Sequence, residues 1–533
     1  MLKRHKLIHA AMVTASLLCS GQVAAKALVY CSEASPETFN PMFGTADSTM
    51  DAAAKTIFNR LVEFKPGTTQ VGPALAERWE VSQDSTVFTF YLRRGVRFHA
   101  NKNFTPTRDF NADDVVYSFE RQWKTDSPYH KLSNGSYEYF NALGLGAVLD
   151  AIEKVDDYTV RFRLKKPDVT FLANIALDYL SILSLEQAQT LVAQGRGDLV
   201  DREPVGTGPF ILTAYQKDSQ IRYRANPDYW NGKPPLDTLV FVITSEPTMR
   251  VAKLRAGECH VTTQPPPSSI ADLQKDPNIK VLRQEGQNIG LLGFNVERAT
   301  LSDKRVRQAL ATAINKQGII DTVYQGSGAS ARTIVPPMQL GSDQDTAGIQ
   351  YDPAAAKELL SEAGYSSGLT VNLWAMPVSR PYNPNARRMA ELIQADWAAV
   401  GVKTNIVTFE WGEYLKRTAR GEHDAFLLGG SSDNGDPDNL LSYILGCEGA
   451  KDGSNRSRWC NPAFESLLQE ARRTTDQNRR SELYKKAQAI IREEAPVVPI
   501  AHSLVSIPVR ANVRNYVFDP FGRQNFAKVD LAE

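Results

Sequence analysis

The chain has 533 residues, and its 61 Lys and Arg nearly balance its 60 Asp and Glu, for a formal net charge of +1. This balance excludes the strongly basic surface that nucleic acids and anionic membranes select. Hydrophobic residues make up 42% and aromatic residues 9% of the chain, which is typical of globular domains and excludes a disordered protein.

Residues 1–25 have the pattern of a secretory signal peptide. A basic start precedes an apolar run from about Leu7 to Leu18, and small residues end the segment at Ala25. The run is too short to span a membrane, and no later stretch reaches the roughly 20 apolar residues that a spanning helix needs. We therefore expect cleavage after Ala25 and export.

Three regions with different predicted secondary-structure patterns follow the signal peptide. Residues 26–285 mix short alternating strands with turns. Residues 286–503 alternate strands with strong helices, which predicts βαβ units and a mostly parallel sheet. Residues 504–533 return to extended segments, which we expect to pair with the first region. The prediction is a discontinuous first lobe, 26–285 with 504–533, and a second lobe, 286–503, joined by two chain crossings.

Two strand-loop-helix units in the second region carry charged loops. A predicted strand at 369–374 leads to a loop with Arg380, and Asn383 is the expected N-cap of the next helix, with Pro384 at its first position. Another strand is predicted at 402–407. Because ligands of open α/β sheets bind at loops that follow strands, Arg380 is a candidate ligand-binding residue.

The second unit is the stretch "GGSSDNGDPDN", residues 429–439, which follows a predicted strand at 424–428. Asp436 is a predicted N-cap before Pro437, and Asp438 lies in the first helical turn, where a negative charge suits the helix dipole. Asp433 has no such structural role. A calcium-binding loop is excluded, because the spacing puts leucines where an oxygen ligand and a glycine are required.

The residues alone favour a binding protein over an enzyme. Gly364-Tyr365-Ser366-Ser367-Gly368 matches the nucleophile motif of serine hydrolases, but a helix precedes it and a strand follows, the reverse of what that motif needs. A secreted hydrolase is therefore disfavoured. Arg380 and Asp433 could instead bind the two ends of a zwitterion. The alternative is that they are surface charges, or that they pair with each other.

Four cysteines remain after cleavage of the signal peptide, which in an oxidising compartment favours two disulfides. The pairing that we favour joins Cys447 with Cys460, which closes a short loop, and Cys31 with Cys259, which ties down the N-terminus. Three connectivities stay open from sequence alone.

Longer stretches of the sequence carry a family resemblance over the whole mature chain. They are "LVYCSEASPETFNP", "LAERWEVS", "LRRGVRFH", "NADDVVYSF", "PVGTGPF", "VRQALATAIN", "RPYNPNARRMAELIQADWAAVGV" and "DNGDPDN". With these runs, the chain resembles the periplasmic dipeptide-binding proteins of bacterial ABC importers, within the peptide/nickel/opine solute-binding family.

The resemblance implies an α/β, two-lobed periplasmic-binding-protein fold (type II, cluster C), with a subdomain inserted at about 59–190 of the first lobe. It implies that Arg380 takes the carboxylate of a peptide and Asp433 its α-amino group, and that the cysteine pairing favoured above holds. Further expected ligand-binding residues are Tyr382, Trp411, Gly430, Ser431 and Ser432.

The implied function is capture of di- or tripeptides in the periplasm by a monomer, without cofactor or metal, for delivery to an inner-membrane ABC permease of the dipeptide type. A chemotaxis receptor is a further candidate partner. Haem or a cationic antimicrobial peptide is the alternative ligand within the family. The chain departs from its relatives at Gly430, where they usually carry tryptophan. This departure predicts an open pocket wall that admits larger ligands, unless neighbouring side chains refill the space.

Overall fold

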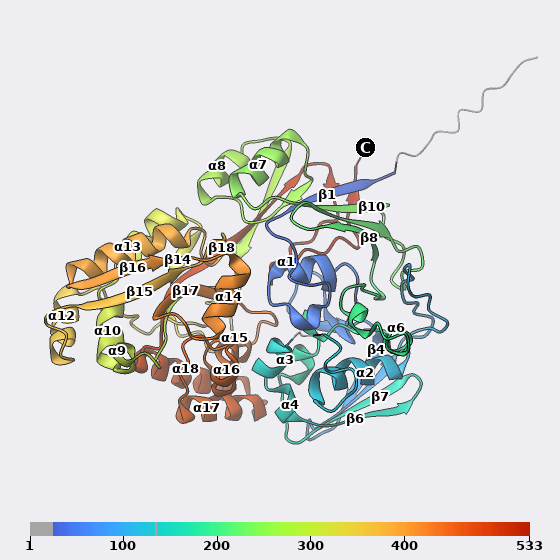
Figure 1. Ribbon diagram of the computed structural model, residues 1–533, viewed down its shortest axis with the longest axis horizontal. Coiled ribbons are helices and arrows are strands. Elements are labelled where there is room, and N and C mark those ends of the chain that lie inside the picture. Colours follow the sequence, from blue (N-terminus) through green and yellow to red (C-terminus); the bar gives the residue numbers. More distant parts are fainter. Residues whose placement is uncertain (1–24, 134–135, 533) are drawn as a thin grey trace, which may run out of the picture.

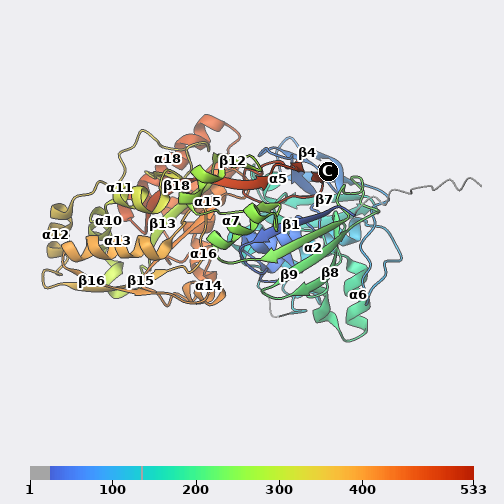
Figure 2. The ribbon, with the colours of Figure 1, turned by 90° about the horizontal axis from the view of Figure 1, so that it is seen from above.

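The computed structural model describes residues 25–133 and 136–532, so the predicted signal peptide lies outside the described residues except for Ala25. The chain forms two bodies that lie side by side (Figures 1 and 2). Buried apolar side chains from 28–261 and 507–531 form the core of the first body, and those from 289–501 form the core of the second. This is the predicted two-lobed α/β architecture.

The first lobe contains one end of a large mixed sheet and a separate antiparallel sheet. On its side of the large sheet, the strands are β11 (Val261–Thr262), β1 (Ala27–Ser32), β10 (Thr238–Ile243), β9 (Gln220–Ala225) and β8 (Phe210–Gln216). The separate sheet has the order β4 (Ala76–Val81), β5 (Val87–Leu92), β7 (Thr159–Leu164) and β6 (Leu149–Asp156). Two short pairs are β2 (Val62–Phe64) with β3 (Val71–Pro73) and β19 (Val513–Arg514) with β20 (Asp530–Leu531).

The helices of the first lobe are short, apart from α2, which packs against β6 and β7. A capping box starts α2: the Asn111 side chain accepts from the Asp113 amide, and Asp114 accepts from the Asn111 amide. The helices are α1 (Asp47–Thr49), α2 (Ala112–Trp123), α3 (Glu138–Ala142), α4 (Leu145–Val148), α5 (Phe171–Asn174), α6 (Leu185–Ala193), α7 (Pro247–Ala256) and α8 (Ile270–Leu273).

The second lobe carries the other end of the large sheet and the longer helices. Its strands are β16 (Val402–Val407), β15 (Leu369–Ala375), β17 (Ala425–Ser431), β13 (Asn288–Phe294) and β14 (Gly328–Ser330). Its helices are α9 (Ala299–Ser302), α10 (Lys304–Thr312), α11 (Lys316–Ile319), α12 (Pro353–Glu362), α13 (Ala386–Ala399), α14 (Trp411–Ala419), α15 (Pro437–Leu445), α16 (Cys447–Asp452), α17 (Pro462–Arg473) and α18 (Gln477–Glu494). Within the described residues, no helix is long and apolar enough to cross a membrane.

One long strand, β18 (Val497–Arg510), belongs to both lobes. Its first part pairs with β13 and β14 of the second lobe, and its later part pairs with β12 (Ile279–Glu285) and β11 of the first. Glu285 faces Leu504 in this ladder. The two predicted chain crossings, at 285/286 and 503/504, therefore lie opposite each other on neighbouring strands.

The sheet of the second lobe is mixed, so the prediction of a mostly parallel sheet is wrong. Strand β15 pairs in parallel with β16 and β17, as strands joined by helices do. Strand β13 instead pairs antiparallel with both β17 and β18. The alternation of strands and helices fixes only the direction of strands that follow one another, and β13 joins partners more than a hundred residues away.

The loops that follow β15 and β17 differ in two details from the prediction. The N-cap of α13 is Asn385, whose side chain accepts from the Arg388 amide, rather than Asn383. Asn383 is held in a two-way backbone bridge with Arg380 and so cannot cap a helix. Strand β17 also continues through Ser431, because its pairing with β13 extends over residues predicted as loop. Asp436 caps α15 as predicted.

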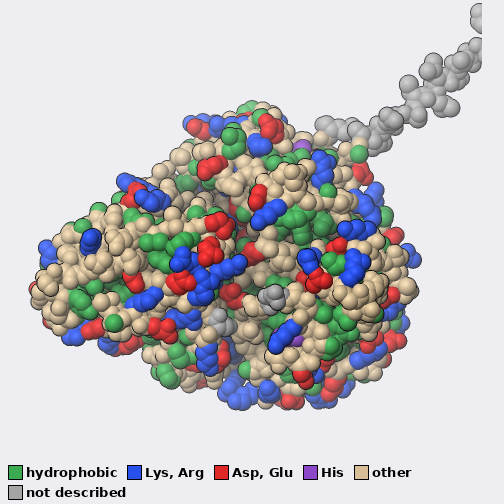
Figure 3. Space-filling model, viewed as in Figure 1, with side chains coloured by type: hydrophobic (Ala, Val, Ile, Leu, Met, Phe, Trp, Pro, Cys, Tyr) green, Lys and Arg blue, Asp and Glu red, His purple; other side chains and the backbone are tan. Residues whose placement is uncertain are grey.

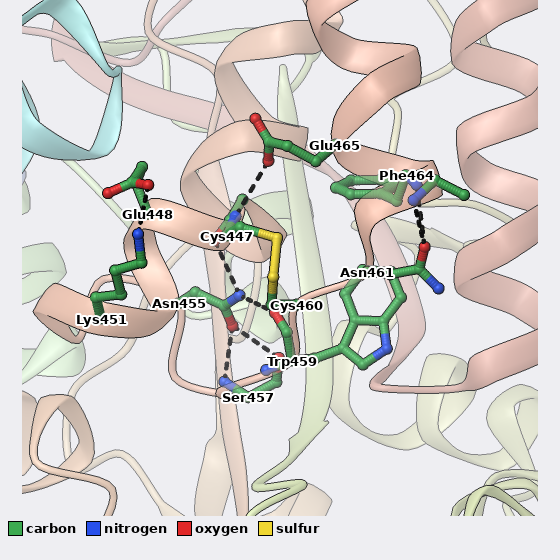
Figure 4. The surroundings of a disulfide bond; sticks show 12 residues. Cys447, Glu448, Lys451, Asn455, Ser457, Trp459, Cys460, Asn461, Phe464 and Glu465 are labelled. Atoms are coloured by element: carbon green, nitrogen blue, oxygen red, sulfur yellow. Dashed lines mark hydrogen bonds and ion pairs between the residues drawn. A yellow bond between two sulfur atoms is a disulfide. The ribbon is translucent and has the colours of Figure 1, made fainter. Parts of the chain in front are cut away.

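The structure contains both favoured cysteine pairs. Cys31 joins Cys259, with their Cα atoms 5.8 Å apart, and so fixes β1 beside the end of α7. Cys447 joins Cys460 across a Cα–Cα distance of 4.7 Å. In Figure 4 the second bridge lies beside Asn455, whose side-chain amide donates to the carbonyls of Gly446 and Trp459. The bridge therefore closes a loop that hydrogen bonds already shape.

Removing the Cys447–Cys460 bridge is expected to lower stability and leave ligand affinity unchanged. Closing a loop of this size restricts the unfolded chain and contributes about 2–4 kcal/mol. The variant Cys447→Ser with Cys460→Ser should melt at a lower temperature than the native protein, as followed by circular dichroism. Calorimetry on the folded variant checks the affinity. A melting temperature equal to that of the native protein would contradict the stabilising role.

Candidate ligand-binding site

Arg380 and Asp433 lie at the same edge of the second lobe's sheet. Arg380 follows β15 and Asp433 follows β17, and these strands are neighbours that run in parallel. Both side chains face the first lobe and are buried, at 3% and 7% exposed. They are not surface charges, and each forms its ion pair with the first lobe rather than with the other.

The guanidinium of Arg380 is held by a carboxylate and an aromatic ring. Its Nη1 donates to Oε1 of Glu33 at 2.9 Å, and its guanidinium carbon lies 5.2 Å from the centre of the Trp411 ring. Its Nη2 is buried and has no hydrogen-bond partner among the described residues. Half of the donor fork of Arg380 is therefore free to bind a second acceptor.

The carboxylate of Asp433 has a cationic and a phenolic partner. Nη2 of Arg523 donates to its Oδ1 at 2.6 Å, and the hydroxyl of Tyr139 donates to its Oδ2. The Tyr139 ring is stacked between the rings of Tyr179 and Tyr443, with centroid distances of 3.6 and 4.9 Å. Burial raises the pKa of Asp433 to about 6, against the opposing charge of Arg523.

A small cavity lies between the lobes, beside both charged residues. It is lined by Pro381, which follows Arg380, by Glu33, which binds Arg380, and by Ser431, two residues before Asp433. Residues of β18 close one side of it. Its free volume is about 30 Å³, which is room for about one water molecule, so a peptide side chain enters only when the lobes move apart. Outside this site, charges of both signs are interspersed over the face seen in Figure 3.

The other residues predicted for the site lie around these two, with different contacts. Trp411 begins α14 beside Arg380, and its Nε1 is buried without a hydrogen-bond partner. Burial raises the pKa of Tyr382 to about 12, and its backbone carbonyl accepts from the Tyr324 hydroxyl at 2.6 Å. The buried Ser432 hydroxyl accepts from the Gly435 amide and so shapes the loop itself.

Strand β17 has free space beside Gly430, where a side chain could be added. A Cβ built there would meet only Cδ2 of Leu440, at an ordinary contact distance of 3.5 Å. A Cβ on the preceding Gly429 would lie 2.2 Å from the carbonyl oxygen of Ile289. A side chain at position 430 would point toward α15, which carries Tyr443 of the aromatic stack one helical turn after Leu440.

The sequence analysis missed the partners that the first lobe supplies. Glu33 comes from the loop after β1, Tyr139 from α3, and Arg523 from the tail near the C-terminus. Arg523 also pairs with Asp47 and Asp178. The local sequence around these residues contains no signal that they would be buried at this site. For Arg523 in particular, nothing in the extended tail shows which arginine is buried.

The hydrolase-like motif of the sequence can also be placed in the described structure. Ser366 is exposed after α12, and its hydroxyl lies 3.0 Å from that of Ser361, with no histidine partner. No group of His, Cys, Asp and Glu among the described residues could hold a metal ion.

Two lobes joined by a shared strand, with buried and partly unsatisfied charges between them, define a protein that closes over a small solute. The match to a family model agrees with this class: residues 70–452 match the middle region of the bacterial extracellular solute-binding proteins, family 5. The chain belongs to this family.

Known relatives match nearly the whole chain. The dipeptide-binding protein of Escherichia coli (strain K12) is 51% identical over 530 residues, 99% of each chain. Heme-binding protein A of Haemophilus influenzae is 46% identical over 503 residues, which covers 94% of this chain and 92% of that protein. The crystal structure of a dipeptide-binding protein from Pseudoalteromonas sp. SM9913 in complex with Met-Leu has a TM-score of 0.92 at 41% identity and covers 95% of this chain and all of that one.

Proposed function

We propose that this protein is a receptor for short peptides, which captures di- and tripeptides by their two charged ends and does no chemistry on them. The observation that carries the proposal is the pair of buried ions at one edge of the second lobe, Arg380 and Asp433, each paired with an ion of opposite sign from the first lobe. We call Arg380 and Asp433 the anchor residues.

The first-lobe partners have the chemistry of a peptide's ends. Glu33 presents a carboxylate to Arg380, as the C-terminus of a peptide would, and Arg523 presents a cation to Asp433, as the α-ammonium would. A carboxylate that used both Nη1 and Nη2 of Arg380 would satisfy the donor that is now free, and forked pairs of this kind are strong when water is excluded. Two fixed anchors select for ligand length and for free termini, not for side chains.

The proposed function also implies a location and a division of the chain into lobes. We propose that residues 1–25 direct export to the periplasm, that lobe I is 26–285 with 504–533 and lobe II is 286–503, and that the segment of about 59–190 is an inserted subdomain. Supporting this, the separate sheet of β4 to β7 lies within that segment, and each lobe has its own core. Delivery to an ABC permease, with a chemotaxis receptor as a further partner, completes the proposed role.

Calorimetry with blocked peptides tests the proposal. Ala-Ala should bind, whereas N-acetyl-Ala-Ala and Ala-Ala amide should each bind at least about a hundredfold more weakly, because each leaves one buried charge unpaired. Chromatography of the same mixtures should recover the peptides uncleaved. Equal binding of free and blocked peptides would refute the anchors.

Haem is the competing ligand, since one close relative is a haem-binding protein. None of the described residues that line the cavity is a histidine, cysteine, methionine or tyrosine, the side chains that ligate haem iron. Titration with haemin should therefore produce no absorbance shift typical of an axially ligated iron. Such a shift, with no binding of Ala-Ala, would replace the peptide proposal by haem binding.

Gly430→Trp is expected to narrow the range of ligands. The space beside position 430 is open toward α15, so an indole ring can enter it and approach the aromatic stack next to Asp433. Binding of Ala-Ala-Ala and Trp-Ala should weaken by about 1–3 kcal/mol, the usual cost of overpacking, while Ala-Ala changes less. Calorimetry with the three peptides measures this selectivity.

Gly429→Ala is the matched control for this substitution. Its Cβ would meet a carbonyl oxygen of β13 at 2.2 Å, so it should lower the melting temperature without selecting between ligands. Equal affinity changes for all three peptides in Gly430→Trp, or a native protein that already rejects the two larger ones, would show that neighbouring side chains refill the space.

A further inference from the structure

Acidic side chains are the charged groups that line the cavity between the lobes in the described structure. Three of its lining residues are carboxylates, Glu33, Asp47 and Asp51, and none of its described lining residues is a lysine, arginine or histidine. Glu33 and Asp51 are 6% and 2% exposed. A buried carboxylate is unfavourable unless a cation or several hydrogen bonds compensate it, so this lining favours a ligand that brings positive charge.

Two of the three carboxylates form ion pairs with arginines beside the cavity. Arg380 pairs with Glu33, and Arg523 pairs with Asp47. Asp51 forms no ion pair within the described structure. It accepts from the backbone amide of Gln524 at 2.8 Å and from the Tyr30 hydroxyl at 3.4 Å. Burial raises the pKa of Asp51 well above its usual range.

A bound peptide would change this balance. Its carboxylate competes with Glu33 for Arg380, and Glu33 then keeps only the Ser32 hydroxyl, at 3.4 Å. Its α-ammonium competes with Arg523 for Asp433. A dipeptide with neutral side chains adds one charge of each sign and brings no further cation to these carboxylates. A basic side chain would bring one.

We propose that this cavity is a side-chain pocket for lysine or arginine, so that peptides with one basic residue are the preferred ligands. The proposal rests on the proposed function and names its substrate class. The side-chain cation would be held among Glu33, Asp47 and Asp51. The methylene stem would pack on the apolar lining residues, as long basic side chains do elsewhere. These lining residues are Val505, Ile507 and Phe521.

Calorimetry with matched peptides tests the native protein directly. Norleucine has the length of lysine without its charge, so we compare Ala-Lys with Ala-norleucine and Lys-Ala with norleucine-Ala. At least one lysine peptide should bind about tenfold or more tightly than its norleucine counterpart, a preference typical of a desolvated charge contact. Ala-Glu should bind more weakly than Ala-Gln.

If neither lysine peptide binds more tightly than its norleucine counterpart while Ala-Ala binds, this inference fails and the proposed function stands. If Ala-Ala does not bind, the proposed function itself fails.

The variant Asp51→Asn tests whether the side-chain cation of the bound peptide lies in this cavity. An asparagine can still accept from the Gln524 amide, so the local hydrogen bond is kept while the charge is lost. The ratio of lysine to norleucine affinities should fall at least about threefold in this variant, because one of the charges that hold the cation is gone. Asp150→Asn, on the exposed side of β6, is the matched control and should keep the native ratio. A native ratio in Asp51→Asn would overturn the assignment to this cavity. The comparison of peptides on the native protein decides the charge preference even if Asp51→Asn does not fold.

Discussion

Arg380→Ala is expected to weaken the binding of Ala-Ala by about 2–5 kcal/mol, as removal of one partner of a buried charge pair does. The loss comes from the peptide carboxylate, which would enter a closed site without a cation. Calorimetry at a temperature below the melting transition measures the affinity, because the substitution also leaves Glu33 buried without its partner and should destabilise the empty protein.

Two further variants make this result specific. Arg387→Ala removes an arginine from the exposed face of α13, seven residues away, and should bind Ala-Ala as the native protein does. Glu33→Gln removes the internal carboxylate that competes for Arg380, so Ala-Ala should bind at least as tightly as to the native protein. Weaker binding in Glu33→Gln would mean that Glu33 holds the ligand rather than competing with it.

Asp433→Ala is expected to cost a similar amount, about 2–5 kcal/mol, and to remove a pH dependence. Burial raises the pKa of Asp433 to about 6 in the empty protein. Only the ionised carboxylate can pair with an α-ammonium, so binding is favoured above this pH. As the pH falls through 6, a growing fraction of Asp433 must release a proton before the peptide binds. The affinity should then decrease by about tenfold for each further pH unit.

Titrations of Ala-Ala between pH 4.5 and 7.5 follow this decrease, with the range set by the pKa of Asp433. The native protein should show the decrease, and Asp433→Ala should show weak binding that varies little over this range. Asp438 provides an internal comparison, because burial also raises its pKa to about 6 but Arg472 holds it away from the cavity. A decrease that persists in Asp433→Ala would therefore point to another group such as Asp438.

The local pattern of the second lobe was enough to predict much of its structure. Proline and asparagine or aspartate signals gave the start of α15, and apolar alternation gave β15 and β16. The pairing of β13 was not predictable in this way, since its partners β17 and β18 are distant in sequence. The N-cap of α13 moved by two residues because a backbone bridge between Arg380 and Asn383 took precedence over the cap.

The positions of the two proposed anchor residues could be predicted from the sequence, but those of their ion-pair partners could not. Arg380 and Asp433 follow neighbouring strands whose direction the βαβ pattern determines, so their meeting at one edge followed from the sequence. Glu33 and Arg523 reach the same place from opposite ends of the chain. Nothing in a local pattern fixes such a contact, because it depends on how the first lobe closes on the second.

The strand shared by both lobes also determines when the protein can fold. β18 lies in the interior of the large sheet, between β13 of the second lobe and β11 of the first. A chain that has been made only as far as residue 496 therefore leaves two sheet edges without a partner, and β13 and β11 are not brought together. Because contacts so distant in sequence form late, a growing chain of this kind stays unfolded or loosely packed during most of its synthesis. Addition of the last long strand then supplies the missing partner to both lobes at once.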